Sequence, residues 1–191
     1  MKPIAAGAHE HDGRWVNDDT IALAVAAGWP IGRAGEITPL VLREPMAPHL
    51  AAAREGRSIE LPPLLAAFER SSASAEFMVV EGVGGFRVPL ARGRDTADLA
   101  RAFALPVAMV VGMRLGCLNH ALLTADAVAA AGLELRGWIA NVVDPAMAAL
   151  DDNVDALRER LDAPLLGRLP HEVPPEPRRL AAALDVGPLL K

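Results

Sequence analysis

The chain has 191 residues, of which 52% are hydrophobic, and a formal net charge of −5. Its length fits one domain, which would bury roughly 70% of its unfolded surface, and we expect a single domain over residues 1–191. The acidic balance excludes general attraction to nucleic acid or anionic lipid. Without a stretch of about 18 apolar residues or a secretory signal, and with Cys117 as its only cysteine, the chain is expected to be soluble and cytoplasmic.

Short apolar runs bounded by turn residues recur along the chain, with helical stretches between them. This alternation is typical of a parallel sheet with crossover helices. The predicted strands are Lys2 to Ala6, Phe77 to Glu81, Pro106 to Gly112, Leu135 to Val143 and Pro164 to Pro170.

Helices are predicted between these runs. Asn17, Asp18 or Asp19 can cap a first helix that continues through Ala27. The segment from Gly28 to Pro63 is predicted to be loops, apart from a short helix near residues 49–55. Further helices are expected at residues 95–105, 119–131 and 151–161, the second ending at Gly132. We therefore predict an α/β fold with one doubly wound, mostly parallel sheet flanked by helices.

In such folds ligands bind at the carboxyl ends of the strands. Glu81, Gly82, Val83, Gly84 and Gly85 follow the apolar FMVV run at such a position. A carboxylate there can hold Mg²⁺, and glycines let the backbone approach a phosphate. A tight turn with a surface acid explains the same residues equally well. The segment lacks the spacing of a dinucleotide-binding fingerprint.

Three other strand ends carry candidate residues. Lys2 beside an apolar strand, followed by Asp18 and Asp19, suits a site for phosphate and Mg²⁺, although a terminal lysine is commonly only solvated. The helix start near residues 114–120 offers free N–H groups to an anion. Asn141 ends a strand, where its amide suits reading a base edge or forming a turn.

The run His9, Glu10, His11 and Asp12 has the composition of a metal site. It lies in a polar loop without a cysteine or a third histidine at ligand spacing. We therefore do not assign a metal to it.

Several strings occur together in an order that resembles the dethiobiotin synthase family. They are KPIAAGA, NDDTIAL, EPMAPHLAAAREGRSI, VVEGVGGFRVPL, VVGMRLGCLNHALLTA, GWIANVVDP and APLLGRLP, and they run from Lys2 to about Pro170. The resemblance implies a fold like that of P-loop NTPases, a homodimer, and ATP as co-substrate with Mg²⁺. It also implies closure of a cyclic urea from 7,8-diaminononanoate and CO₂, with no nucleic acid or membrane as partner.

The resemblance also implies roles for individual residues. Lys2 corresponds to the active-site lysine, and Asp19 and Glu81 correspond to Mg²⁺ ligands that also contact ATP. The other implied ATP-binding residues are Gly82, Val83, Gly84, Asn141, Val142, Pro170, His171 and Glu172. Those implied for the substrate are Ala6, Gly116, Cys117, Leu118 and Asn119, the last four binding its carboxylate across the dimer interface.

Two departures from the family pattern stand out. Ala6 takes the place of a residue that often carries a hydroxyl. The phosphate-binding motif G-x-x-x-x-G-K-[ST] needs a lysine after a glycine, and neither Lys2 nor Lys191 meets that requirement. We therefore expect the strand, phosphate loop and helix that open the family fold to be missing from this chain.

Three hypotheses follow. The chain belongs to a working dethiobiotin synthase whose start lies upstream of Met1, or it is a truncated product that folds or dimerises without ATP turnover. The third hypothesis is another branch of the same fold, such as an amidoligase of cobalamin synthesis or a partitioning ATPase. The LGCLNH string and the Lys2-Pro3 start speak against this third hypothesis.

Overall fold

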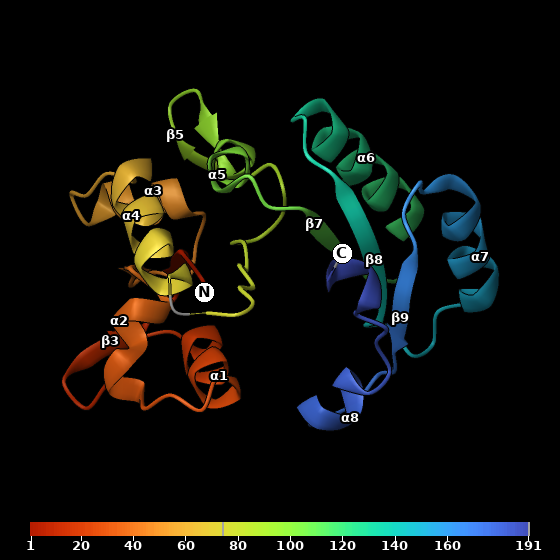
Figure 1. Ribbon diagram of the computed structural model, residues 1–191, viewed down its shortest axis with the longest axis horizontal. Coiled ribbons are helices and arrows are strands. Elements are labelled where there is room, and N and C mark those ends of the chain that lie inside the picture. The colour runs from red at the N-terminus through yellow and green to blue at the C-terminus, as the bar shows by residue number, and fades with distance from the viewer. Residues whose placement is uncertain (74, 191) are drawn as a thin grey trace. The chain divides into compact units, whose positions relative to one another are not determined.

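The computed structural model describes residues 1–73 and 75–190. The chain divides into two compact units, Met1–Phe103 and Ala104–Lys191. Each unit contains parallel strands with helices beside them, which confirms the α/β class (Figure 1). The parallel strands lie in two separate sheets, one in each unit, instead of the one predicted sheet.

In the first unit, strands β1 (Ile4–Ala6) and β4 (Leu40–Leu42) pair in parallel, with Ile4 opposite Leu40. Ile4, Ala5 and Leu42 are almost fully buried, so this pair forms part of the unit's core. The strand predicted at residues 2–6 is confirmed. Two antiparallel hairpins complete the strands: β2 (His9–His11) with β3 (Arg14–Val16), and β5 (Pro89–Ala91) with β6 (Arg94–Asp95).

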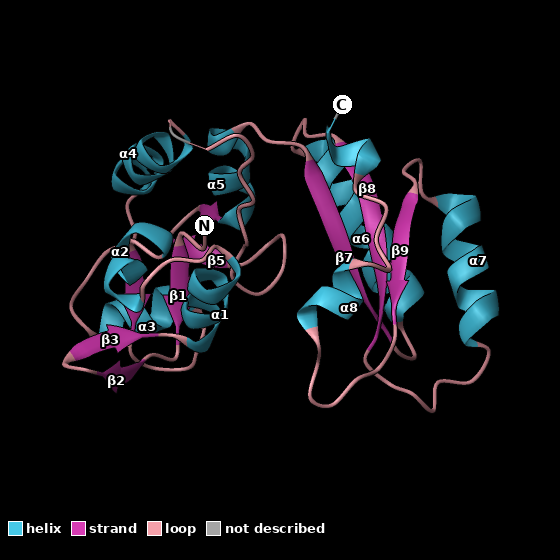
Figure 2. Ribbon diagram, turned by 60° about the horizontal axis from the view of Figure 1, so that its bottom comes forward, coloured by secondary structure: helices cyan, strands magenta, loops and turns pink. Residues whose placement is uncertain are grey.

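The helices of the first unit confirm three of the predictions. They are α1 (Asp18–Ala26), α3 (Pro48–Arg54) and α5 (Thr96–Phe103), seen in Figure 2. At the start of α1, the side chain of Asn17 accepts a hydrogen bond from the Asp19 amide at 3.0 Å, as expected of an N-cap. A short α2 (Ala34–Ile37) follows the 3₁₀ turn Ile31–Arg33.

Some local predictions in this unit were wrong. Residues 77–81 form no strand, because they pair only with Met1 and leave Phe77 and Val79 more than half exposed. The region predicted as loops, residues 28–63, contains α2, β4 and the beginning of α4 (Leu61–Ser72) in addition to the predicted short helix. Pro62 and Pro63 lie in the first turn of α4, where proline starts a helix instead of breaking it.

The second unit is a three-stranded parallel sheet in the order β7 (Val107–Met113), β8 (Leu135–Val142) and β9 (Leu165–Leu169). All three strands confirm predictions. The helices α6 (Cys117–Ala130) and α7 (Leu150–Arg160) connect them, as predicted. Gly132 follows α6 with a φ of 72° and closes the helix in the expected manner.

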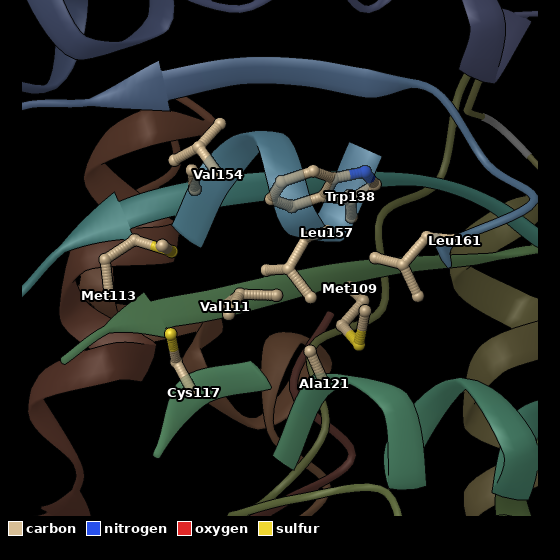
Figure 3. Packing of buried hydrophobic residues seen from close by; sticks show 10 residues of the cluster. Met109, Val111, Met113, Cys117, Ala121, Trp138, Val154, Leu157 and Leu161 are labelled. Atoms are coloured by element: carbon tan, nitrogen blue, oxygen red, sulfur yellow. The ribbon is translucent and has the colours of Figure 1, made fainter. Parts of the chain in front are cut away.

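Both long helices pack against the same face of this sheet. Alternate residues of β7 and β8 point toward α6 and α7, as Figure 3 shows. The buried cluster consists of Met109, Val111, Met113, Cys117, Ala121, Trp138, Ala140, Val154, Leu157 and Leu161. This packing fixes the ends of the strands, where the predicted binding residues lie.

The C-terminal segment contains α8 (Pro177–Ala181) and the 3₁₀ turn Gly187–Leu190, and it returns to pack against β9. The Asp185 amide donates to the Leu166 carbonyl at 2.7 Å. A Cβ on Gly167 would lie only 2.2 Å from the Ala183 carbonyl oxygen, so this close approach requires glycine. The segment therefore has a structural role that its sequence did not indicate.

Candidate active site

Lys2 lies between two carboxylates that are far apart in the sequence. Its Nζ is 2.7 Å from Oε1 of Glu81 and 3.0 Å from Oδ2 of Asp19. Nζ also donates to the Gly82 carbonyl at 3.0 Å. The structure thus brings together four of the residues predicted for the site, all within the first unit.

The lysine is buried and the two acids are accessible. The Lys2 side chain is 6% exposed, whereas those of Asp19 and Glu81 are about half exposed. Burial acts to lower the pKa of Lys2, but the hydrogen bonds and negative charges of Glu81 and Asp19 outweigh it, so the pKa is raised above its usual value. The ammonium group is therefore charged at neutral pH.

Local hydrogen bonds place each acid beside the lysine. The Asn17 side chain donates to the carbonyls of Ala6 and Gly7 at 3.1 and 3.2 Å, and it also caps α1. This single residue therefore connects the end of β1 to the helix turn that carries Asp19. On the other side, the Glu81 amide donates to the Met1 carbonyl at 2.8 Å, which holds Glu81 next to Lys2.

The two carboxylates have the composition of a magnesium site. Mg²⁺ in proteins is commonly bound by one or two carboxylates together with waters and substrate phosphates. The cluster of one ammonium and two carboxylates has an excess of one negative charge, and both acids are accessible from solvent. Asp19 and Glu81 therefore fit the cation that the resemblance implies.

The glycines after Glu81 form an exposed loop. Gly84 has a φ of 76°, and a Cβ there would lie 3.1 Å from a methyl of Val88. Both observations restrict this position to glycine. Gly82 and Val83 are also in the loop, and Ala6 ends β1, where its methyl group cannot replace a hydroxyl donor.

In the second unit, the remaining predicted residues gather at the carboxyl ends of the strands. Asn141 pairs with Gly112 of β7 on one side and with Leu169 of β9 on the other. Pro170 directly follows Leu169, and the helix start at Gly116 follows β7. The predictions from three separate strings therefore share one edge of this sheet.

The helix start at residues 116–119 offers backbone donors. Gly116 caps α6 with a φ of 93° and without a side-chain hydrogen bond. Among the described residues, Cys117 and His120 donate to nearby carbonyls, while no such bond is found for the amides of Leu118 and Asn119. The Cys117 side chain is buried in the core, so only its backbone is placed to meet a ligand.

A pocket of about 430 Å³ opens beside the end of β8. Val142, Pro170 and His171, all predicted for ATP, line it together with Pro145, Leu150 and Arg168. Asn141 does not line the pocket, because neighbouring residues of a strand point to opposite faces and its neighbour Val142 points into the pocket. Glu172 faces the C-terminal segment, where it forms an ion pair with Arg179 and accepts a hydrogen bond from the Glu176 amide.

Sequence reasoning missed some participants. The Gly82 carbonyl accepts a hydrogen bond from Lys2, and Arg168 lines the pocket while it forms an ion pair with Asp151. A backbone acceptor leaves no signal in the residue types. Arg168 reaches the pocket only through the pairing of β9 with β8.

Among the described residues there is no group of three or more potential metal ligands, the run from His9 to Asp12 included. Within residues 1–73 and 75–190, no helix has the length and apolar character required to cross a membrane.

Comparison with known proteins identifies relatives of the chain. A family model described as an AAA domain matches residues 1–177. A curated protein of Aromatoleum aromaticum, described as "ATP-dependent dethiobiotin synthetase BioD", is 54% identical over 184 residues. This similarity covers 96% of the present chain and 81% of the relative.

These findings bear on the hypotheses raised by the sequence. The P-loop NTPase type of fold is confirmed, and the similarity favours dethiobiotin synthesis over the other branches of that fold. The hypothesis of a product without ATP turnover finds no support in them. The chain belongs to the AAA-domain family and, within it, to the ATP-dependent dethiobiotin synthetases.

Proposed function

We propose that the protein is a ligase that forms dethiobiotin from 7,8-diaminononanoate, CO₂ and ATP, with release of ADP and phosphate, in the cytoplasm. The observation that carries this proposal is the contact of Lys2 with Asp19 and Glu81. The 54% identity to a dethiobiotin synthetase supports the choice of reaction.

The reaction proceeds in three steps. One amine of the substrate captures CO₂ as a carbamate, whose oxygen then attacks the γ-phosphorus of ATP and displaces ADP. The second amine attacks the carbon of the carbamoyl phosphate, a C–N bond forms, and phosphate leaves. Negative charge develops on carbamate and phosphoryl oxygens throughout, so the protein must supply positive charge and hydrogen-bond donors.

Lys2 is suited to that task. Its ammonium group is buried and charged, and its position is fixed by the Gly82 carbonyl. We assign it to hold the carbamate and the transferring phosphoryl group through N–H donors. Asp19 and Glu81 would hold Mg²⁺, which supplies further charge neutralisation at phosphate oxygens. The glycine loop from Gly82 to Gly84 lets its backbone approach the phosphates.

The residues at the sheet edge of the second unit are assigned to the adenine of ATP and to the carboxylate of the diamine substrate. Val142, Pro170 and His171 line a pocket that suits an adenine ring. Asn141 and Glu172, each next in the sequence to a residue of that lining, are assigned to the polar groups of the adenine. The start of α6, Gly116 to Asn119, is assigned to the substrate carboxylate. In our proposal the carboxylate belongs to a substrate molecule that is bound at the active site of the partner subunit in a homodimer.

The proposal is tested by measuring whether ATP cleavage requires the diamine. Phosphate release should require 7,8-diaminononanoate, CO₂ and Mg²⁺ together, and omission of any one should reduce it to background. The measurement is continuous phosphate detection with and without each component. Cleavage of ATP at the same rate without the diamine would contradict the proposed reaction.

A further inference from the structure

The loop from Gly82 to Val88 joins Glu81 to strand β5, and it contains neither a helix nor a strand. Gly82 and Glu81 both contact Lys2, so the shape of this loop bears directly on the candidate site. Most of its residues are exposed, and a core therefore cannot fix it. Its conformation must depend on specific hydrogen bonds.

Thr96, the first residue of α5, provides these hydrogen bonds. Its hydroxyl oxygen lies 2.7 Å from the Phe86 carbonyl and 3.1 Å from the Gly85 carbonyl. The same oxygen accepts a hydrogen bond from the Val88 amide at 2.8 Å. The Thr96 amide in turn donates to the Val88 carbonyl at 2.9 Å.

These contacts need a residue that both donates and accepts. A hydroxyl has one proton to donate and lone pairs to accept, and the Thr96 side chain uses both capacities on the loop. Thr96 is 6% exposed, so water cannot readily take over these bonds. Valine has nearly the same shape as threonine but can form none of these side-chain hydrogen bonds.

Thr96 acts on the segment beside the Glu81 carboxylate through Val88 and Gly84. Val88 is bound to Thr96 at both its amide and its carbonyl, and its methyl group lies beside Gly84, 3.1 Å from where a Cβ of that residue would stand. Gly84 is two residues from Gly82, the acceptor of Lys2. A fixed Val88 therefore limits the conformations open to the glycines.

We propose that Thr96 is a positioning residue, which fastens the glycine loop and thereby holds Glu81 and Gly82 in place for Mg²⁺ and nucleotide. That the loop serves Mg²⁺ and nucleotide rests on the proposed function. That Thr96 fixes the loop rests on the hydrogen bonds alone.

The test compares Thr96→Val with two controls. Thr96→Ser keeps the hydroxyl. Thr38→Val removes a different buried hydroxyl, which lies 2.7 Å from that of Thr20 and does not bond to residues 82–88. Two properties of the full chain are measured: exchange of individual amide protons by NMR, and the dissociation constant and KM for Mg·ATP.

We expect Thr96→Val to speed exchange of the Val88 and Glu81 amides about tenfold relative to the Ala51 amide in α3, which is the size expected for loss of a buried hydrogen bond. Mg·ATP should bind about tenfold more weakly, with KM changed more than kcat. Thr96→Ser should restore both properties. Thr38→Val should lower the melting temperature and leave the exchange of the Val88 and Glu81 amides unchanged.

Unchanged exchange at Glu81 in Thr96→Val, or the same change in exchange in Thr38→Val, would overturn the positioning role. Failure of the unaltered protein to bind Mg·ATP would instead contradict the proposed function. In that case amide exchange still decides whether Thr96 fastens the loop.

Discussion

Asp19 and its neighbour Asp18 differ in what they contact, although they are adjacent in one helix turn. Asp19 lies 3.0 Å from the ammonium of Lys2, whereas Asp18 is 90% exposed and lies 3.7 Å from His9. The sequence offered both as candidates for a cation site. Of the two, Asp19 is the one that contacts Lys2, and it is also the residue that the family resemblance implies.

This difference gives a matched pair of substitutions. Asp19→Asn should weaken Mg²⁺ binding by at least about tenfold, because the amide keeps the shape but loses the negative charge. Asp18→Asn should leave it within about twofold. Titration calorimetry with Mg²⁺ in the presence of ATP measures both, and equal affinities in the two variants would remove Asp19 from the metal site.

At the scale of elements, the conformation of the loop after Glu81 depends on Gly84 more than on Gly85. Gly84 has a positive φ, and a Cβ there would lie 3.1 Å from a methyl of Val88, while a Cβ on Gly85 would meet nothing within 4 Å. Gly84→Ala should therefore impose about 1–2 kcal/mol of strain on the loop, and it should raise the KM for ATP several-fold. Gly85→Ala should have little effect. Steady-state kinetics distinguish them, and an unaffected Gly84→Ala enzyme would contradict the described loop conformation.

The core of the second unit supports the strand ends through α7. Leu157 is fully buried in the cluster with Trp138. Leu157→Ala should lower the free energy of unfolding by about 2–5 kcal/mol, because it leaves a cavity. Leu123→Ala on α6 is the control, since Leu123 is 59% exposed. Thermal or denaturant unfolding measures both. Equal losses in the two variants would show that the described core is wrong.

Elements with strong periodicity or clear caps could be predicted from the sequence. The strands and helices from Val107 to Leu169 were found because buried strands and amphipathic helices alternate there. The apolar run at residues 77–81 was misleading, because a strand also needs a partner of sufficient length, and Met1 supplies only one residue. Strand β4 was missed because three residues between turns give too short a pattern.

For the site, residue chemistry indicated Lys2, Asp19 and Glu81 separately. Their convergence at 3.0 and 2.7 Å follows from long-range packing, which local patterns do not encode. The same reason explains why Arg168 in the pocket and Thr96 behind the loop were not foreseen. Short motifs could identify the acids, whereas the groups that position them became visible only in the structure.

For the whole molecule, the two units place their candidate residues by the same rule. Ala6 ends β1 in the first unit, while Asn141 and Pro170 stand at the ends of β8 and β9 in the second. Functional residues at the carboxyl ends of parallel strands are typical of α/β enzymes. This organisation agrees with membership of the AAA-domain family over residues 1–177.

The central claim is that this protein joins CO₂ to a diamine at the expense of ATP, with Lys2 in the active site. It is tested most directly by mass spectrometry of the product formed from 7,8-diaminononanoate, ¹³C-labelled bicarbonate and Mg·ATP. The account predicts dethiobiotin with one ¹³C atom in its urea carbonyl, formed with one ADP per product. Lys2→Met should form it at least about a hundredfold more slowly, which is the size expected for loss of a charged group at the transition state. Absence of labelled dethiobiotin from the unaltered protein, or an undiminished rate in Lys2→Met, would contradict the account.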